Sequence, residues 1–534
     1  MKVATLCDDI TAAALRFEWL TEALQPVSEV GRARFAAVRP FRSGEEPAAG
    51  RHARRVSEVA RAIAAELIDG VREALRELPD IGGAIARARL DDVLSDADLF
   101  EMLRFCDASE RIATLTLNTI LDGLQPCGPL QRALEPGRTG KFGFYLADAL
   151  DDGLARRRSD LRAAQAQFDA ACGRLSSGVA QALGRENVAT DEFIVMRDDV
   201  RGHLPAGVHV VREAPTYFLC SLELDENALA ALGRRDQCAR EVASAEEAVR
   251  ARLGGIIRAC GDALEAAVSC AGELDVLLAA ARFAQRHQCV APTYVNQARI
   301  EFVEGRFLPL ERELEREDRV YVPVAMQVAG ASVLTGPNMG GKTVALKTCG
   351  FIALCAAFGL PVPARSASVA LFSEIAWMGI GIPEAAEDLL SSFAREVVRL
   401  RDTLDSDLER ALLLIDEFGR TTNPGEGRAL LLALIGRLQA RKACAVIATH
   451  LASIAKDAAV PHFAVRGLRS ASATSEAKDT KGALRELATR MDYRIDRVTQ
   501  ERDRASDAIE LARLLGLDKE LVEKAKEILT QWTP

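Results

Sequence analysis

The sequence reads T-G-P-N-M-G-G-K-T-V-A-L-K from Thr335 to Lys347. This stretch contains the pattern G-x-x-x-x-G-K-[ST], in which a glycine-rich loop holds phosphate groups. A short apolar run, Ala331–Leu334, precedes the loop, and a helical pattern follows it from Val344 to Leu354. A chance glycine-rich turn would need neither a strand before it nor a helix after it. The order strand, loop and helix therefore predicts a nucleotide site in an α/β domain.

Each residue type in the loop has a predicted task. Backbone N–H groups near Gly336, Gly340 and Gly341 are expected to point at anionic oxygens, because glycine lets the chain curl around them. Lys342 is expected to reach the β- and γ-phosphates of ATP and to assist catalysis there, and Thr343 to offer its hydroxyl to Mg²⁺. The predicted cofactors are ATP and Mg²⁺. The nucleotide-binding residues predicted from the loop are Gly336, Pro337, Asn338, Met339, Gly340, Gly341, Lys342 and Thr343.

Two further apolar strands end in polar residues that complete a hydrolytic site. The run Leu412–Ile415 is followed by Asp416 and Glu417. We expect Asp416 to hold the Mg²⁺ shell and Glu417 to act as the general base that activates water. A third run, Cys444–Ala448, leads to His450. A lone histidine is usually structural, but its place at the carboxyl end of a strand predicts a γ-phosphate sensor.

The net charge of the chain bears on whether its partner is a nucleic acid. The net charge is −9, whereas a dedicated nucleic-acid-binding domain usually carries a basic surface. The charge argues against DNA without excluding it, because arginines cluster locally. Each cluster, considered alone, is also explained as the solvent-exposed face of a helix without any role in binding nucleic acid. The clustered residues are Arg32, Arg34, Arg39, Arg42, Arg51, Arg54, Arg55, Arg234 and Arg235.

Other features of the composition indicate a cytoplasmic protein. The sequence has no apolar run of about eighteen residues, the length that a membrane helix needs. Acidic residues follow its first few positions, where a signal peptide would have its apolar core. The twelve cysteines form no C-x-x-C pair and most lie among apolar residues. Reduced core thiols are therefore expected, without a zinc site.

The residues before the loop predict a helical scaffold. Apolar residues recur at helical spacing from Asp8 to about Leu130, with breaks at proline-containing segments. Two longer patterns, about 142–185 and 227–268, carry heptads and predict a pair of long helices that form a lever. Three short β-type runs between them, 193–196, 208–211 and 217–220, predict a small sheet at the tip.

The predicted fold class follows from these patterns. It is an α-helical core and a long helical lever with a small β tip, then an α/β P-loop ATPase domain of ABC type and a C-terminal helical pair. The predicted domains are 1–140, the helical core; 141–270, the lever, with a clamp-like tip at about 190–222; 271–300, a return helix to the core; 301–469, the ATPase; 470–490, a polar loop; and 491–534, a helical dimerisation element.

The motifs resemble those of the MutS family of ATPases. Thr335–Thr343 matches the family's loop T-G-P-N-M-G-G-K-[ST], Asp416–Thr422 its acidic pair and following loop, and Ala448–His450 its histidine switch. Glu273–Leu277 and Glu304–Arg306 resemble elements that precede the family's ATPase. Compared with mismatch-repair members of the family, the sequence is expected to start at the helical core, and the resemblance implies neither their two N-terminal domains nor their Phe-x-Glu wedge.

The resemblance implies a homodimer with ATP sites at the subunit interface. The loop Asp388–Phe393 would then bring Ser391 or Ser392 to the partner's γ-phosphate, although the glycine-containing spacer of the family is missing before these serines. Tyr321, or the neighbouring Val320, stands where the family places the platform for adenine.

Two functions are compatible with this site. The first is a MutS-like ATPase whose ATP cycle drives a clamp on DNA in a repair- or recombination-related role. The second is an ATP-dependent factor that reactivates a cobalamin-dependent aminomutase, because the loop Thr422–Gly427 is closer to that branch of the family and the chain is acidic. Both predict the reaction ATP + H₂O to ADP and phosphate, and neither predicts a membrane.

Overall fold

The computed structural model divides into two compact units. The first comprises Met1–Arg76, Leu115–Gly123 and Cys270–Pro534, and the second comprises Glu77–Thr114 and Leu124–Ser269. The ATP-site motifs all lie in the first unit, so the two units are described separately. The structure describes residues 1–140, 143–200, 203–337, 341–379, 392–405, 407–420, 422–451, 453–468, 491–498, 509, 512–513 and 517–532.

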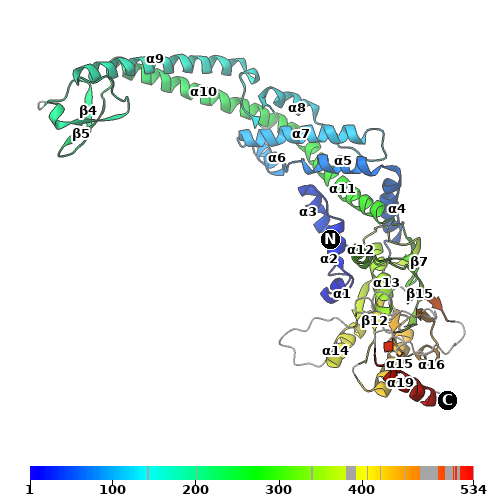
Figure 1. Cartoon of the computed structure of the whole chain (residues 1–534). Helices are drawn as coiled ribbons and strands as arrows, with labels where there is room; N and C mark the ends of the chain where they lie inside the picture. Colours follow the sequence, from blue (N-terminus) through cyan, green and yellow to red (C-terminus); the bar gives the residue numbers. More distant parts are fainter. Residues whose placement is uncertain are drawn as a thin grey trace. The chain divides into compact units, whose positions relative to one another are not determined.

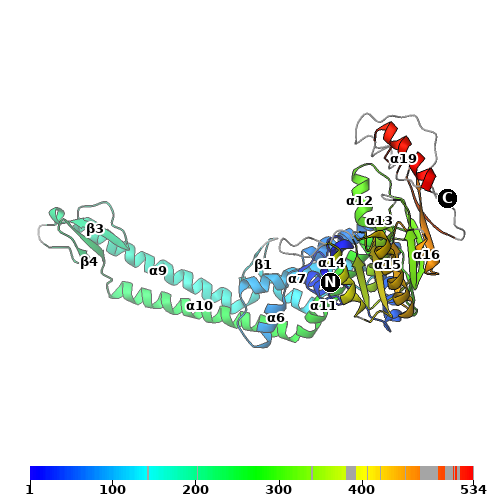
Figure 2. The same cartoon turned by 90° about the horizontal axis from the view of Figure 1, so that it is seen from below.

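A six-stranded sheet forms the centre of the first unit (Figure 2). Its strand order is β11-β12-β13-β9-β14-β15, and all neighbours are parallel except β14 and β15. Every residue of β9, β12 and β13 is buried, as expected for a parallel sheet covered on both faces. The strands are β9 (Ala331–Thr335), β11 (Glu374–Met378), β12 (Ala411–Asp416), β13 (Cys444–Ala448), β14 (His462–Leu468) and β15 (Met491–Arg497).

Helices before and after these strands complete the nucleotide-binding region. Helix α13 follows β9 directly, and all but three of its residues are buried. A second sheet of order β6-β10-β7-β8 lies in the same unit. The helices are α12 (Leu308–Arg316), α13 (Lys342–Ala357), α14 (Ser392–Leu404), α15 (Pro424–Ala440), α16 (Ile454–Asp457) and α19 (Lys519–Trp532), and the strands are β6 (Thr293–Val295), β7 (Arg299–Gly305), β8 (Val324–Ala329) and β10 (Ser366–Ala370).

The N-terminal residues cover the edge of the six-stranded sheet at β11. The backbone N–H of Ile375 donates to the carbonyl of Leu6 at 2.8 Å, and that of Trp377 to the hydroxyl of Thr11 at 3.0 Å. An uncovered edge strand offers free hydrogen-bonding groups to other chains, so this cover removes a site of aggregation. The N-terminal helices are α1 (Asp9–Ala14), α2 (Phe17–Ala23), α3 (Glu29–Ala37), α4 (Glu46–Ala62) and α5 (Ala65–Arg76).

A buried carboxylate joins α3 to α11 (Gly261–Arg286). Asp275 on α11 is fully buried and accepts hydrogen bonds from the N–H of Val27 at 3.1 Å and the N–H of Ser28 at 2.7 Å. It also accepts from the Ser28 hydroxyl at 2.6 Å. The side chain thereby satisfies donors at the start of a distant helix. This contact gives the segment Glu273–Leu277 a structural role.

The second unit contains a pair of long helices with a small sheet. Helices α9 (Asp152–Ala182) and α10 (Glu226–Ala259) run side by side in both views (Figures 1 and 2). Between them in sequence lies a sheet of order β3-β5-β4. The unit also contains the helices α6 (Gly82–Arg89), α7 (Asp96–Thr116) and α8 (Gly128–Leu134) and a two-stranded sheet of β1 (Arg138–Thr139) and β2 (Gly143–Phe144). The strands of the small sheet are β3 (Glu192–Met196), β4 (Val208–Glu213) and β5 (Tyr217–Leu222).

Burial along α9 differs from the predicted heptad. Leu154 is fully buried, but Leu161 and Phe168 are only half-buried, while Ala164 and Ala171 are buried. A pair of helices has only one contact face, so small residues lie at the closest approach and larger ones flank it. The heptad predicts the helix but not which of its residues are covered.

Four predicted boundaries are wrong. The first long helix begins at Asp152 rather than near 142, and the strand β2 (Gly143–Phe144) lies before it. The first helical segment breaks at Ile63, which has extended backbone between α4 and α5, although no proline or glycine marks that position. The second long helix ends at Ala259 rather than near 268, and α11 begins at Gly261. The return helix predicted to reach residue 300 ends at Arg286, after which β6 begins at Thr293. Apolar periodicity continues across these breaks, so it does not reveal them.

Two further predictions concern the ends of the chain and the membrane. The helical element predicted at 491–534 is wrong at its start, because residues 491–497 form the strand β15, which pairs with β14 and extends the ATPase sheet. Helix α19 lies in the predicted C-terminal helical pair, and the polar loop predicted at 470–490 lies outside the described residues. Among the helices that the structure describes, none is long and apolar enough to cross a membrane.

Candidate nucleotide site

The glycine-rich loop connects β9 to α13, as its sequence predicts. Gly336 has φ +152° and Gly341 has φ +91°, a backbone conformation that glycine adopts without strain. A Cβ atom on Gly336 would lie 2.9 Å from the Cβ of Val465, so this position also lacks space. The backbone thus requires glycine at both positions. Asn338, Met339 and Gly340, the middle of the predicted loop, lie outside the described residues.

Lys342 is buried and folds back over its own loop. Its Nζ donates to the carbonyl of Gly336 at 2.8 Å and to that of Pro337 at 3.3 Å. The same atom lies 3.3 Å from Oε1 of Glu417, and both side chains are less than 10% exposed: 5% for Lys342 and 9% for Glu417. The structure therefore brings together the predicted phosphate-binding lysine and the predicted general base.

Thr343 and Asp416 also meet, as predicted for a shared metal site. The Thr343 hydroxyl donates to Oδ2 of Asp416 at 2.7 Å. Oδ1 of Asp416 is buried and has no hydrogen-bond partner. Burial raises the pKa of this carboxyl group, and the neighbouring charge of Glu417 adds to the effect. A buried, unsatisfied carboxylate oxygen beside a hydroxyl group fits a hard cation such as Mg²⁺, so the donor set is compatible with the predicted metal.

Glu417 occupies a special backbone position. Its φ is +55°, in the left-handed region that non-glycine residues seldom adopt, and its N–H donates to the carbonyl of Ala448 at 3.0 Å. Oε2 accepts from Nη1 of Arg420 at 3.1 Å. Strained backbone of this kind is concentrated at functional sites, where surrounding structure fixes a side chain in place. Glu417 is thus held between two cations at the end of β12.

The histidine predicted as a γ-phosphate sensor is placed at the surface. His450 follows β13 and its side chain is exposed. The preceding Thr449 is buried, and its N–H donates to the carbonyl of Leu334 at 3.0 Å. A different histidine contacts the strand before the loop: Nε2 of His462 lies 2.7 Å from the Thr335 hydroxyl. His462 has no motif around it, so the sequence offered no signal for this contact.

The predicted adenine platform is anchored in the protein interior. The hydroxyl of Tyr321 accepts from the N–H of Phe307 at 3.0 Å and lies 3.1 Å from the Thr348 hydroxyl on α13. Burial raises the pKa of the Tyr321 phenol. The neighbouring Val320 is 87% exposed. A second tyrosine, which the sequence did not single out, lies closer to the loop: Cδ1 of Tyr493 is 3.1 Å from the Cβ position of Gly341.

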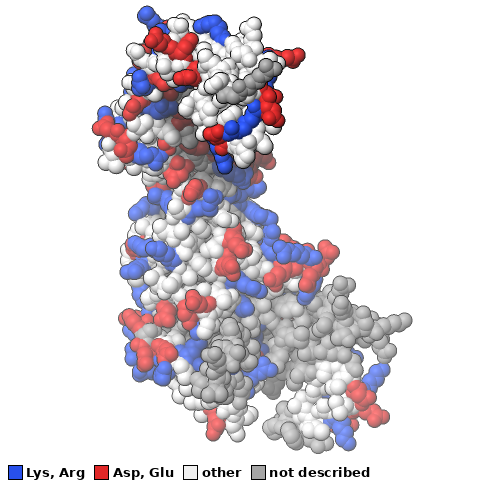
Figure 3. Space-filling view, turned by 90° about the vertical axis from the view of Figure 1, so that its left-hand side faces the viewer, with Lys and Arg blue, Asp and Glu red and all other residues white. Residues whose placement is uncertain are grey.

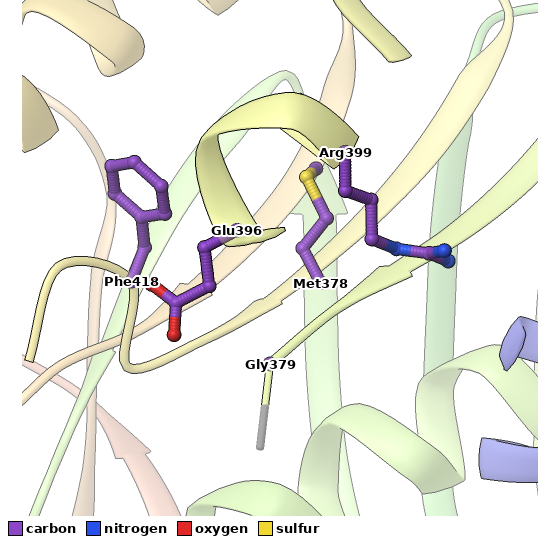
Figure 4. A pocket seen from close by; sticks show the side chains of 5 residues that line it. All are labelled: Met378, Gly379, Glu396, Arg399 and Phe418. Carbon is purple, nitrogen blue, oxygen red and sulfur yellow. The ribbon is translucent and has the colours of Figure 1, made fainter. Parts of the chain in front are cut away.

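A small pocket lies beside the acidic pair (Figure 4). Glu396 and Arg399 leave α14 in different directions, and Oε2 of Glu396 accepts from the N–H of Gly419 at 3.2 Å. Nε of Arg399 donates to the carbonyl of Trp377 at 2.7 Å, and its Nη1 lies 2.7 Å from Oδ2 of Asp8. The Glu396 contact joins α14 to the loop that follows Glu417, and the Arg399 contacts join it to β11 and to the residue before α1. Ser392 is the first residue of α14, and Ser391 lies outside the described residues.

Four of the nine clustered arginines noted in the sequence form ion pairs, with at least one in each cluster. Arg34 pairs with Glu273, Arg39 with Glu45 at 2.7 Å and Arg55 with Asp122 at 3.4 Å. Arg235 pairs with Asp236 at 2.6 Å. In the face shown in Figure 3, basic and acidic side chains are interspersed. Solvated helix faces therefore explain these clusters better than a nucleic-acid surface.

Comparisons with known proteins point to one group of relatives. The family described as MutS domain V matches residues 332–533. Endonuclease MutS2 of Clostridium botulinum (strain Langeland) is 35% identical over 185 residues, 34% of this chain and 23% of that protein. Endonuclease MutS2 of Geobacillus thermodenitrificans is 26% identical over 471 residues, 84% of this chain and 56% of that protein. The chain therefore spans little more than half the length of the Geobacillus relative and less than a quarter of that of the Clostridium relative.

Proposed function

We infer that this chain, which belongs to the MutS family, hydrolyses ATP at the loop between β9 and α13. Members of this family are ATPases. The observation that carries the proposal is the meeting of Lys342, Thr343, Asp416 and Glu417 around one loop, with one oxygen of Asp416 buried and unsatisfied. These four side chains are the types that phosphoryl transfer to water requires.

The proposed roles follow from the contacts. The ammonium group of Lys342 would exchange the carbonyls of Gly336 and Pro337 for phosphate oxygens, which are stronger acceptors. Thr343 and Asp416 would hold Mg²⁺, which when bound supplies charge neutralisation at the phosphates. The movement of Lys342 toward phosphate would release Glu417.

Glu417 would then act as the general base. Its carboxylate would take a proton from the water that attacks the γ-phosphorus atom, the bond to the bridging oxygen would break, and ADP and phosphate would form. His450 would contact the γ-phosphate from the exposed end of β13, and Ser391 or Ser392 would contact that of a partner subunit. Tyr321 remains the proposed adenine platform, and Tyr493 is a second aromatic residue placed to contact a base.

The direct test is phosphate release by the purified full chain, with and without Mg²⁺. We expect turnover that requires Mg²⁺ and is lost on the substitution Lys342→Ala. A wild-type protein that neither binds nor hydrolyses ATP would refute the proposal. Sedimentation with and without ATP would test the proposed homodimer, for which ATP is expected to favour the dimeric form.

We further propose that the ATP cycle moves α9, α10 and their small sheet as a clamp, and that the clamp acts on DNA. The relatives are named endonucleases, which supports a role on DNA in repair or recombination. Binding of a duplex through its phosphates should weaken steeply with salt. Gel shifts with linear, branched and single-stranded DNA at low salt test this role, and an absence of retardation with and without ATP would refute it.

One observation favours a protein partner as the second candidate. The small sheet exposes four apolar side chains, and its Arg197 pairs with Glu213 rather than remaining available to phosphate. An exposed apolar group on a sheet is more typical of protein recognition than of contact with DNA. The relatives give no support for an aminomutase as that partner. The exposed residues are Ile194, Met196, Val210 and Val211.

A further inference from the structure

Four helices of the first unit line an open cavity of about 280 Å³ that is separate from the ATP-binding loop. Helices α2, α5, α11 and α12 supply its lining. Five of the described lining residues are arginines, and the same lining includes one carboxylate, Glu22. In a chain with a net charge of −9, such a concentration of positive charge needs an explanation. The arginines are Arg72, Arg282, Arg286, Arg312 and Arg316.

The arginines are only partly neutralised by the protein. Arg282 is paired with Asp69 through bonds of 2.9 and 3.1 Å. Nη2 of Arg72 donates to the carbonyl of Gln25 at 2.9 Å, but its Nε is buried without a hydrogen-bond partner. Arg286, Arg312 and Arg316 form no ion pair with any residue that the structure describes. The guanidinium groups of Arg286, Arg312 and Arg316 therefore leave positive charge in the lining that no described carboxylate neutralises.

Aromatic residues form the uncharged part of the lining. The rings of Trp19 and Phe283 are 6.5 Å apart, and that of His287 lies 5.8 Å from Trp19 and 4.9 Å from Phe283. His287 is 8% exposed. Burial, followed by the charges of Arg286, Arg312 and Arg306, lowers its pKa to about 4, so its ring is neutral at pH 7. The cavity therefore combines an apolar wall with an arginine wall.

Helix dipoles explain two of the five arginines. Arg286 and Arg316 lie in the last turns of α11 and α12, where a positive charge stabilises the carbonyl end of a helix. That effect does not require Arg312, one turn earlier, or Arg72 from another helix. It also does not explain why three of the four helices contribute arginines to one cavity. An anion held among them accounts for all these features.

We propose that this cavity binds a small phosphate-bearing anion. Arginine forms paired hydrogen bonds with phosphate oxygens, and several guanidinium groups can hold one phosphate from different sides. The volume is near the lower end of that of small-molecule sites, which fits inorganic phosphate, pyrophosphate or the phosphate end of a nucleotide rather than a duplex. The site does not depend on the proposed ATPase, because none of its lining residues belongs to the loop between β9 and α13.

The test uses the full chain with Lys342→Ala, in which phosphate binding by the ATP loop is weakened. Isothermal titration with pyrophosphate, in EDTA at low salt, should show binding. The double substitution Arg286→Gln with Arg312→Gln should weaken that binding about tenfold or more, since two charge-assisted contacts are lost. The matched control, Arg51→Gln with Arg54→Gln, removes the same charge from exposed positions on α4 and should change affinity less than about twofold.

Further titrations with other ligands distinguish a nucleotide from free phosphate as the bound anion. Tighter binding of AMP than of inorganic phosphate would support a nucleotide, and equal affinity would support a free phosphate. Arg316→Gln provides a second, exposed variant if the double substitution unfolds the chain, and it should also weaken binding. Absence of binding at millimolar pyrophosphate, or equal weakening by the control, would overturn the proposal. Binding of a short duplex through these arginines without binding of pyrophosphate would overturn it too.

Discussion

The substitution Glu417→Gln tests the proposed general base. The amide keeps the size of the side chain and one acceptor oxygen, but it cannot take up a proton at neutral pH. Loss of a general base slows a reaction by about 10²- to 10⁴-fold, which corresponds to roughly 2.7 to 5.4 kcal/mol in the activation barrier. We therefore expect hydrolysis to fall by this factor.

The same contacts predict that nucleotide binding survives. Lys342 keeps its bonds to Gly336 and Pro337, so the loop retains its anchor when the negative charge of Glu417 is removed. Arg420 loses an ionic partner, but it is 53% exposed and solvent replaces most of that interaction. We expect ATP to bind at least as tightly as it binds the wild type, because the substitution also weakens the internal partner that competes for Lys342.

Single-turnover release of phosphate and binding of a fluorescent ATP analogue measure the two quantities separately. Glu426→Gln is the matched control, because Glu426 is an exposed glutamate in the following helix whose bond to Thr422 is long, at 3.4 Å. The control should hydrolyse ATP at close to the wild-type rate. Hydrolysis by the Glu417 variant within about threefold of wild type would remove Glu417 from the general-base role.

Three further substitutions test the surroundings of this site. Asp416→Asn should abolish Mg²⁺-dependent hydrolysis. Because burial raises the pKa of Asp416, stability should fall as pH rises from the ordinary carboxyl range through that raised pKa, and the variant should lose this part of the pH dependence of Tm in EDTA. Gly379→Ala would place a Cβ 2.5 Å from that of Asp416, so chemical denaturation should show a free energy of unfolding lower by about 1–3 kcal/mol. The same substitution should weaken the activation of hydrolysis by Mg²⁺. An unchanged Mg²⁺ titration would contradict the packing argument. Tyr321→Phe removes the hydroxyl bonded to Phe307 and Thr348 and should cost about 1 kcal/mol of unfolding free energy with ATP affinity unchanged; a large loss of affinity would show that the hydroxyl positions the site.

The elements around the loop could be predicted because their signals are local. The apolar run at 444–448 matches β13, and β12 extends the run at 412–415 by one residue at each end. A buried parallel strand needs a short continuous apolar run, and a glycine loop needs glycines at fixed positions. The three short strands of the small sheet were likewise visible between their turn residues.

Contacts between distant segments could not be predicted in the same way. The bond between His462 and Thr335 joins residues 127 positions apart, and that between Asp275 and Ser28 joins residues 247 apart. Nothing near His462 in sequence distinguishes it from a surface histidine. Tyr493 reaches Gly341 only because β15 pairs with β14 at the edge of the sheet. Such proximity depends on strand order, which periodicity does not encode.

The cavity lined by arginines is a surface feature that could not be predicted from the sequence either. Four of the nine arginines in the clusters that were visible as neighbours in sequence pair with carboxylates, whereas the concentrated positive charge comes from arginines on three separate helices. Each of these arginines has the ordinary spacing of a solvated helix face. Only the packing of the helices brings them together.

The fold-back of Lys342 gives the site an interlock. A general base that is free in the absence of substrate has no reaction to catalyse. A lysine side chain without an internal partner would bind anions with little selectivity. Here the Lys342 ammonium group and the Glu417 carboxylate bind each other. Neither group becomes available until an incoming ligand offers Lys342 better acceptors than two backbone carbonyls and a carboxylate. Selectivity for a polyphosphate then comes partly from competition within the protein, because a weaker anion cannot displace the internal partners.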